Sequence, residues 1–243
     1  MSLSYLNFSG GGTVVNVIAI IIGGLIGLFG GKFLNERIQE TLKMSCATAI
    51  IFIGIGGTLG NMFKIQGDGG LEFYNVMLLI AGLVGGGLIG EIIDIENAFE
   101  KLGVWLRSHS GNDGDNHFVD AFVTASLTVC VGAMAVIGAI NDRLLHDYTI
   151  LFAKSVLDLI IILVMTASLG KGCIFSCVSV GIFQGAITLF AGFLEPIMTE
   201  VALKNLSCVG NALIFCVGIN LMFGNKIRVA NLLPALIIAV LWA

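Results

Sequence analysis

The sequence predicts an all-α membrane protein of about eight transmembrane helices, with internal, partly inverted repeats and short interfacial helices. Three observations predict this class: the composition, the series of apolar segments and a glycine pattern that occurs three times. Of the 243 residues, 57% are hydrophobic and 12% are charged. Soluble domains carry about 25% charged residues, so this chain has about half the charged residues that a soluble protein of its length uses on its surface.

Eight apolar segments supply the predicted helices. Each approaches the roughly 20 residues that a helix needs to cross the hydrocarbon core, although the last one is short. Helices are favoured because backbone amides in lipid must be satisfied within the segment, and the alternation expected of barrel strands is absent. Together the segments form one transmembrane domain over residues 12–243, after a polar, glycine-rich lead at residues 1–11. They cover residues 13–31, 45–63, 74–92, 119–140, 149–169, 172–193, 206–223 and 229–242.

Lysine and arginine residues predict the orientation of these segments, because cytoplasmic loops carry an excess of both. With the N-terminus outside, the inner loops hold eight basic residues and the outer loops hold three. Both termini are therefore expected outside. The inner set is Lys32, Arg37, Lys43, Lys101, Arg107, Lys171, Lys226 and Arg228, and the outer set is Lys64, Arg143 and Lys204.

The recurring pattern is a pair of glycines separated by five residues within an apolar segment. Each copy closes a similar series of parts: a glycine-rich span, a polar connection and the span with the spaced glycines. In the first two units the connection is a charged amphipathic stretch, residues 32–43 and 91–107, which we expect to form an interfacial helix. The units cover about residues 13–63, 74–140 and 172–225, and the third should be inverted because it begins inside. Inverted repeats are a construction of many transporters, although glycine-rich segments also produce such matches by chance. The pairs are Gly54 and Gly60, Gly132 and Gly138, and Gly218 and Gly224.

These glycines, and the run Gly85, Gly86 and Gly87, allow two interpretations. Small residues let membrane helices approach closely, and this packing role is the commoner one. In the alternative, the helix unwinds locally and its exposed amides and carbonyls line a site near the midplane. The sequence leaves both interpretations open.

Lys154 and Asp158 are the most informative charged residues, because both lie within a predicted span. Their i,i+4 spacing puts them on one helix face, where they can pair. An ionised Asp in the middle of a span costs roughly 2.5–3.5 kcal/mol, and Lys costs a similar amount. Their presence implies an ion pair, a water-filled cavity or a proton on Asp158. The pair is therefore either a substrate contact or proton-coupling site, or a structural ion pair that orders the bundle.

Four amide side chains add polar groups to the predicted spans. One of them, Asn220, lies inside the third glycine pair, where its amide would be poorly placed against lipid. Together with the charged pair they form the candidate substrate-binding or ion-binding set, which is Asp158, Lys154, Asn220, Gln184, Asn211 and Asn16.

Several functional classes are not expected. No catalytic triad, phosphate loop or metalloprotease motif is present, so we predict neither an enzyme nor a cofactor. Residues 108–117 include two His and two Asp, but their Gly and Asn content is typical of a linker rather than a metal site. The six cysteines lie in or beside predicted spans and are expected to pack as small apolar residues. The absence of a basic tract argues against nucleic acid as a partner.

The opening segment resembles a known bacterial family. Residues 12–27 (GTVVNVIAIIIGGLIG), followed by Gly31 and the connection 35–38 (NERI), resemble the domain-of-unknown-function family 554, integral membrane proteins of YdfK and YqgA type. The resemblance extends over nearly the whole chain. The extra residues before Gly12 depart from the family pattern, as does Asn35, where the family has Pro. The resemblance implies a bacterial inner-membrane location and carries no established activity.

The sequence therefore favours a small secondary transporter or exporter of a small solute or ion, with Asp158 near the binding site. The alternatives are a channel, in which the glycines flank a continuous pore, and a non-transporting membrane scaffold. The expected partners are the lipid bilayer, the unknown solute or ion, and a second copy of the chain. The glycine-rich faces suggest this homo-oligomer, with a dimer as its simplest form.

Overall fold

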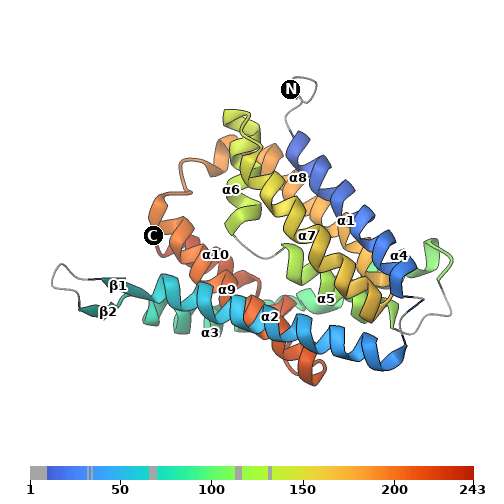
Figure 1. The fold of residues 1–243 in the computed structure, drawn as a ribbon. Coiled ribbons are helices and arrows are strands. Elements are labelled where there is room, and N and C mark those ends of the chain that lie inside the picture. Colours follow the sequence, from blue (N-terminus) through green and yellow to red (C-terminus); the bar gives the residue numbers. More distant parts are fainter. Residues whose placement is uncertain (1–9, 32, 34, 66–69, 113–116, 131–132) are drawn as a thin grey trace. The chain divides into compact units, whose positions relative to one another are not determined.

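The computed structural model describes residues 10–31, 33, 35–65, 70–112, 117–130 and 133–243, and it is almost entirely helical there (Figure 1). The α-helices are α1 Gly11–Gly31, α2 Glu36–Met62, α3 Val76–Ile93, α4 Ile95–His109, α5 Phe118–Cys130, α6 Ala133–Leu145, α7 Thr149–Leu169, α8 Ser176–Leu194, α9 Glu200–Phe223 and α10 Pro234–Leu241. Two 3-10 helices, η1 Lys171–Phe175 and η2 Ala230–Leu232, precede α8 and α10. Strands β1 Phe63–Ile65 and β2 Leu71–Phe73 form an antiparallel hairpin between α2 and α3.

Six helices in the described part of the chain are long and apolar enough to cross a membrane. They are α1, α2, α3, α7, α9 and α8 together with η1. The pair α5 and α6 could supply a seventh span. The segment predicted as the eighth span contains a shorter apolar helix, Ala230–Leu241. A multi-pass helical membrane protein is thus confirmed, whereas the count of eight spans stays a prediction.

The segment 119–140, predicted as one span, consists of two helices. The axes of α5 and α6 are bent by 61° relative to each other. Gly132 falls between them, outside the described residues.

The two amphipathic stretches predicted as interfacial helices differ in the structure. The second is confirmed as a separate helix, α4, which Asp94 divides from α3 with a positive φ of 59°. The first is continuous with the span that follows it, because α2 runs without interruption from Glu36 to Met62. Residues 36–45 contain neither Gly nor Pro, so nothing in the sequence ends the helix there.

The chain forms two compact units. The first unit contains α1, the end of α4, α5, most of α6, α7, η1 and α8. The second contains most of α2, the hairpin, α3, the start of α4, α9, η2 and α10. The first comprises residues 1–43, 103–130 and 134–196, and the second residues 44–102, 131–133 and 197–243.

In the first unit, α1 and α7 lie side by side along their whole length (Figure 1). Glycines four residues apart on α1 face the backbone of α7. A Cβ at Gly23 would overlap the carbonyl oxygen of Leu159, and one at Gly27 would overlap that of Leu163. The paired residue numbers rise together, so the two helices run parallel. Spaced small residues of this kind allow the closest approach of membrane helices.

Helix α8 also packs against α1, but it runs in the opposite direction. A Cβ at Gly181 would come within 3.5 Å of Val17, whereas Gly24 contacts Ile174, which lies just before α8. Residue numbers on α1 rise as those on the η1–α8 segment fall. Helices α1 and α8 are therefore antiparallel.

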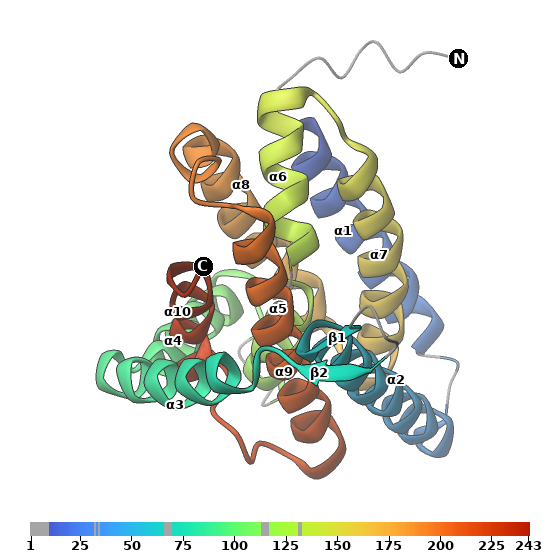
Figure 2. The same cartoon turned by 90° about the vertical axis from the view of Figure 1, so that its left-hand side faces the viewer.

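The second unit uses the same kind of contact between α3 and the segment η2–α10 (Figure 2). A Cβ at Gly86 would overlap the backbone of Ala235, and one at Gly90 would overlap the carbonyl oxygen of Asn231. Gly85 and Gly87, on either side, meet only side-chain atoms of this segment, at 3.2 and 3.1 Å from an added Cβ. The numbers run in opposite directions, so α3 and α10 are antiparallel.

Helices α2 and α9 also run antiparallel within the second unit. A Cβ at Gly54 would lie 2.5 Å from the backbone nitrogen of Phe215, and one at Gly218 would lie 2.7 Å from Ile51 Cγ1. Thr58, one turn beyond Gly54, faces the carbonyl of Cys208 at 3.5 Å.

These contacts bear on the two interpretations of the spaced glycines. Helix α2 is continuous through Gly54 and Gly60, and α9 is continuous through Gly218 to Phe223. Gly224 ends α9 with a positive φ of 80°. In the second pair, Gly138 packs against Leu151. Gly54 and Gly218 are therefore packing positions and Gly224 is a capping position, whereas a Cβ at Gly60 would meet no atom within 4 Å. Only the second copy coincides with a break between helices.

Candidate functional site

The candidate site lies in the first unit, where α7 places two charges on one face. Lys154 Nζ lies 2.5 Å from Asp158 Oδ2, one helical turn away. Only 7% of Lys154 and 4% of Asp158 is exposed. Asp158 occupies the middle of the 21-residue helix. The i,i+4 pair predicted from the sequence is therefore formed directly, near the middle of an apolar helix, where an isolated charge would be costly if the helix spans the bilayer.

Two amide side chains reach this pair from other helices. Asn16 of α1 donates from Nδ2 to Asp158 Oδ2 at 2.9 Å, and its Nδ2 also lies 3.4 Å from Gln184 Oε1 of α8. Both amides are fully buried. The structure thus brings together four of the six predicted residues from α1, α7 and α8.

The end of α5 supplies the remaining partner of the lysine. Lys154 Nζ donates to the carbonyl oxygen of Val129 at 2.7 Å. This carbonyl belongs to the last turn of α5, where C=O groups have no partner within the helix. The interruption of the predicted span after Cys130 therefore produces an acceptor for a buried ammonium group. The site lies beside a discontinuous helix.

Two polar atoms of the cluster have no hydrogen-bond partner among the described residues. They are Oδ1 of Asn16, an acceptor, and Nε2 of Gln184, a donor. Leaving a buried polar group unpaired costs about 1–3 kcal/mol. Such unpaired groups in a buried cluster are available to a ligand or to water. The Lys154 ammonium group and Asp158 Oδ2, in contrast, bond to each other and also to Val129 and Asn16 respectively.

A second polar contact joins α5 and α8 within the same unit. Ser126 donates from Oγ to Ser179 Oγ at 2.9 Å, and both residues are buried. The thiol of Cys130 lies close enough to Lys154 and Asp158 to interact electrostatically with both. Polar side chains of α1, α5, α7 and α8 are therefore buried in the first unit.

The arrangement can perform two kinds of chemistry. A carboxylate and an ammonium group at 2.5 Å can exchange a proton or separate to bind an ion of either sign. An unpaired donor and acceptor nearby can hold a small polar solute. No cluster of His, Cys, Asp or Glu suited to a metal ion is found in the described residues.

Asn211 and Asn220 belong to the second unit and bond to backbone or nearby side chains there. Asn211 Nδ2 donates to the carbonyl of Ser207 at 2.7 Å. Asn220 Nδ2 donates to the carbonyl of Ile227 at 2.6 Å, and its Oδ1 accepts from the amides of Lys226 and Ile227. The Asn220 side chain thus stabilises the turn that follows α9. Its amide bonds to the backbone of that turn and therefore does not need to contact lipid.

Asp142 is a buried charged residue that no sequence pattern indicated. This fully buried carboxylate of α6 accepts hydrogen bonds from the backbone amides of Gly10 and Gly12, at 3.1 and 3.0 Å. It therefore satisfies unpaired N–H groups at the start of α1, where the helix dipole also favours a negative charge. Its position at the end of an apolar segment, directly before Arg143, made it look like an ordinary loop residue.

A network in the second unit was also missed. Glu91 of α3 pairs with Arg228 and accepts from Asn231 Nδ2 at 2.8 Å. Asn231 Oδ1 accepts from the amide of Glu96 at 2.7 Å, while Glu96 Oε2 accepts from the amide of Ala230 at 3.0 Å. Burial raises the pKa of Glu96 above its ordinary value. These bonds fasten the junction of α3 and α4 to η2, so the network holds the second unit together.

The comparisons with known proteins agree with this architecture. A family model described as "Protein of unknown function (DUF554)" matches residues 11–243. The chain is 28% identical over 227 residues to "Uncharacterized membrane protein YdfK" of Bacillus subtilis (strain 168), with 93% of each chain covered. It is 26% identical over 232 residues to "Uncharacterized protein YqgA" of Escherichia coli (strain K12), with 94% of each covered. No solved structure matches it significantly.

Proposed function

The chain belongs to the DUF554 family, and we propose that it is a small secondary transporter that moves a small solute or ion by alternating access. The observation that carries this proposal is the buried polar cluster of the first unit. Asp158 and Lys154 lie there with two amides that retain an unpaired acceptor and donor. Ionisable residues at bilayer depth commonly mark substrate or ion pathways.

The discontinuous helix supports the same proposal. Transporter sites are typically formed where broken helices present their free ends near the midplane. Here the carbonyl of Val129, at the end of α5, binds the Lys154 ammonium group. A substrate that competes for either charge would change the contact between α5 and α7. Binding would then be coupled to movement of the helices.

The directions of the helices support the partly inverted repeats. The first and third proposed repeats begin with α1 and α8, which are antiparallel, and continue with α2 and α9, which are also antiparallel. An inverted relation requires opposite directions for corresponding helices. In this proposal both termini lie outside and the chain functions in the bacterial inner membrane, since inner loops carry most of the lysine and arginine.

One observation favours the scaffold alternative. The Lys154–Asp158 distance of 2.5 Å and the burial of both side chains are also what a purely structural ion pair would show. Such a pair would hold α5, α7 and α1 together without any exchange of partners. In a transporter the Lys154–Asp158 pair would open during each cycle, whereas in a scaffold it would stay closed. A measurement of solute flux therefore distinguishes the two functions.

The test is transport by purified protein in proteoliposomes. A panel of labelled amino acids, organic acids, sugars and inorganic ions is screened for saturable uptake and counterflow. We expect at least one solute to show both with the native chain. Asp158→Asn should reduce its flux at least tenfold and abolish its dependence on pH. The double variant Lys154→Met/Asp158→Asn, which leaves no unpaired charge, should be equally inactive.

Three results would contradict the proposal in different ways. Unitary currents in a planar bilayer would show a channel. Absence of flux for every solute would support the scaffold. Unchanged flux and pH dependence in Asp158→Asn would remove the charged pair from the mechanism.

A further inference from the structure

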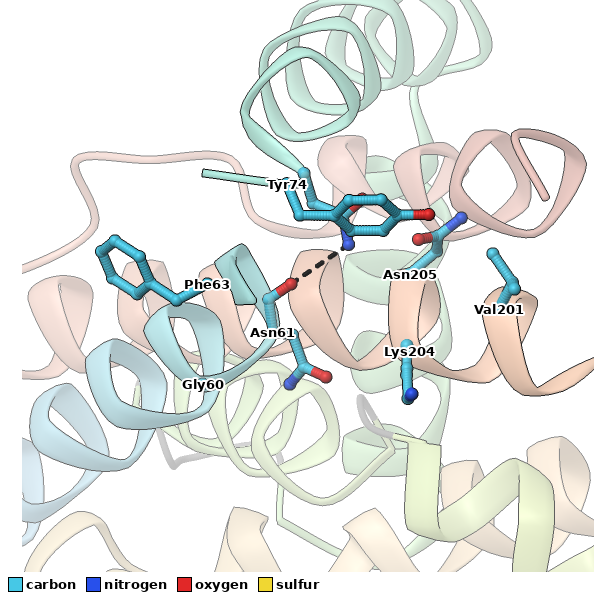
Figure 3. Close-up of a pocket in the computed structure, with 8 residues that line it drawn as sticks. Gly60, Asn61, Phe63, Tyr74, Val201, Lys204 and Asn205 are labelled. Carbon is cyan, nitrogen blue, oxygen red and sulfur yellow. Dashed lines mark hydrogen bonds between the residues drawn. The ribbon is translucent and has the colours of Figure 1, made fainter. Parts of the chain in front are cut away.

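A pocket is lined entirely by residues of the second unit, none of which takes part in the proposed transport mechanism. Its volume is about 300 Å³, at the lower end of the range of roughly 300–1,000 Å³ that small-molecule sites occupy. It is formed where α2 ends, α3 begins and α9 begins (Figure 3). The lining residues are Gly60, Asn61, Phe63, Tyr74, Asn75, Val201, Lys204 and Asn205.

Two of the amide side chains in this pocket are part of its wall. Asn75 Nδ2 donates to the backbone carbonyl of Asn61 at 3.1 Å, the bond drawn in Figure 3. Asn61 Nδ2 donates to the carbonyl of Gly57 at 2.7 Å and lies 3.3 Å from Ser207 Oγ. These bonds tie α2 to α3 and α9. The pocket is therefore held open by hydrogen bonds and does not depend on a ligand for its shape.

The third amide, Asn205, has an unused acceptor. Only 1% of this residue is exposed, and its Oδ1 has no hydrogen-bond partner among the described residues. In Figure 3 its side chain extends from α9 toward Tyr74, on the pocket side of the helix. A buried acceptor that loses its hydrogen bonds to water and gains no partner destabilises the fold. A ligand with an O–H or N–H donor would supply this partner.

Lys204, the preceding residue of α9, supplies the charge. It is the one charged residue in the lining, its side chain is exposed, and no salt bridge to it is found in the part of the chain that the structure describes. The Lys204 and Asn205 side chains leave α9 in different directions (Figure 3), and both residues line the pocket. A molecule that carries an anionic group and a donor would be complementary to this cation and this acceptor. A ligand with only an anionic group would leave the Asn205 acceptor unpaired, and a ligand with only a donor would not use the charge of Lys204.

Gly60 provides an open wall. A Cβ at this position would meet no atom within 4 Å. A side chain added to this lining residue would therefore not displace backbone. Most of the buried glycines of the two units behave differently, because they pack against neighbouring helices.

We propose that this pocket binds a small organic anion that also carries a hydroxyl or ammonium donor. Lys204 attracts the anionic group, and Asn205 Oδ1 accepts the hydrogen bond. Two sources share this chemistry: a free solute such as an amino acid or a phosphorylated polyol, and the glycerol phosphate head group of an anionic phospholipid. Phe63 and Tyr74 are aromatic, as is common where side chains meet the membrane interface.

The experiment measures binding to the purified full chain, after delipidation in detergent, by titration calorimetry. The probes are serine and glycerol 3-phosphate, with acetate as an anion lacking a donor and glycerol as a donor lacking an anion. Serine or glycerol 3-phosphate should bind at least tenfold more tightly than acetate or glycerol. Gly60→Leu and Lys204→Gln should each weaken this binding at least tenfold. The second arm uses nanodiscs of phosphatidylglycerol or phosphatidylcholine, with bound lipid counted by native mass spectrometry.

Gly56→Leu is the matched control. Gly56 lies one turn before Gly60 on α2, is exposed, does not line the pocket, and has no atom within 4 Å of an added Cβ. It should bind as the native chain does. Binding of a free probe assigns the pocket to a solute, whereas retention of phosphatidylglycerol that Gly60→Leu abolishes assigns it to a head group. Absence of both, or binding that Gly60→Leu and Lys204→Gln leave unchanged, overturns the proposal. Because Asp158 takes no part, failure of transport leaves this result unaffected.

Discussion

Gly27→Leu should prevent stable packing of α1 against α7. A Cβ at this position would overlap the carbonyl oxygen of Leu163, which belongs to the backbone and cannot rotate away. Overpacking a core usually costs about 1–3 kcal/mol because side chains adjust. Here the two helices must separate. We therefore expect the free energy of unfolding to fall by more than about 3 kcal/mol, which is more than most single substitutions cost. Unfolding of the purified protein in mixed detergent micelles measures this loss.

Gly30→Leu provides the control on the same helix. Gly30 is exposed and has no atom within 4 Å of an added Cβ. The substitution adds the same side chain to the same helix and should change stability by less than about 0.5 kcal/mol. Equal losses for Gly27→Leu and Gly30→Leu would show that the effect arises from the helix itself and not from its contact with α7.

Removing one charge of the buried pair should cost much more than removing both. Lys154→Met leaves Asp158 without its ammonium partner, and Asp158→Asn leaves Lys154 bound only to neutral acceptors. Breaking a buried pair in this way typically costs about 3–5 kcal/mol, whereas replacing the whole pair is often nearly neutral. The double variant Lys154→Met/Asp158→Asn also retains an oxygen that can accept from Asn16. It should therefore recover most of the loss.

The four proteins of this cycle are compared by unfolding in the same detergent mixture. We expect the double variant to be at least about 2 kcal/mol more stable than the sum of the single losses would allow. Additive losses would mean that the two side chains do not interact in the folded protein. That result would also remove the basis for using the pair as a switch.

Local rules predicted most of the helices and the charged pair. Lys154 and Asp158 are four residues apart within an apolar segment, so their contact follows from helix geometry alone. Such a contact requires no knowledge of the tertiary structure.

The rest of the site could not be predicted, because it depends on contacts between distant segments. Asn16 of α1 bonds to Asp158 of α7, which lies 142 positions later in the sequence. It also lies close to Gln184, which belongs to a third helix, α8. The acceptor at Val129 exists because the helix ends at Cys130, inside a segment that looked like one span. Hydropathy identifies a segment as apolar, but it does not show where the backbone bends.

The most direct test of the central claim is whether water reaches the buried pair from both sides of the membrane. The native Cys130 reports this, since its buried thiol lies in electrostatic range of Lys154 and Asp158. A variant retaining only this cysteine is reconstituted in oriented vesicles and treated from either side with a membrane-impermeant thiosulfonate. A variant retaining only Cys208, buried between α9 and α2, serves as the control.

Alternating access predicts that Cys130 is labelled from each side much faster than Cys208 is. Labelling should reach one group per chain, because every molecule passes through both states. A Cys130 that stays unlabelled from either side, while the unfolded protein reacts fully, would contradict the account. The charged pair would then be a permanently dry structural contact.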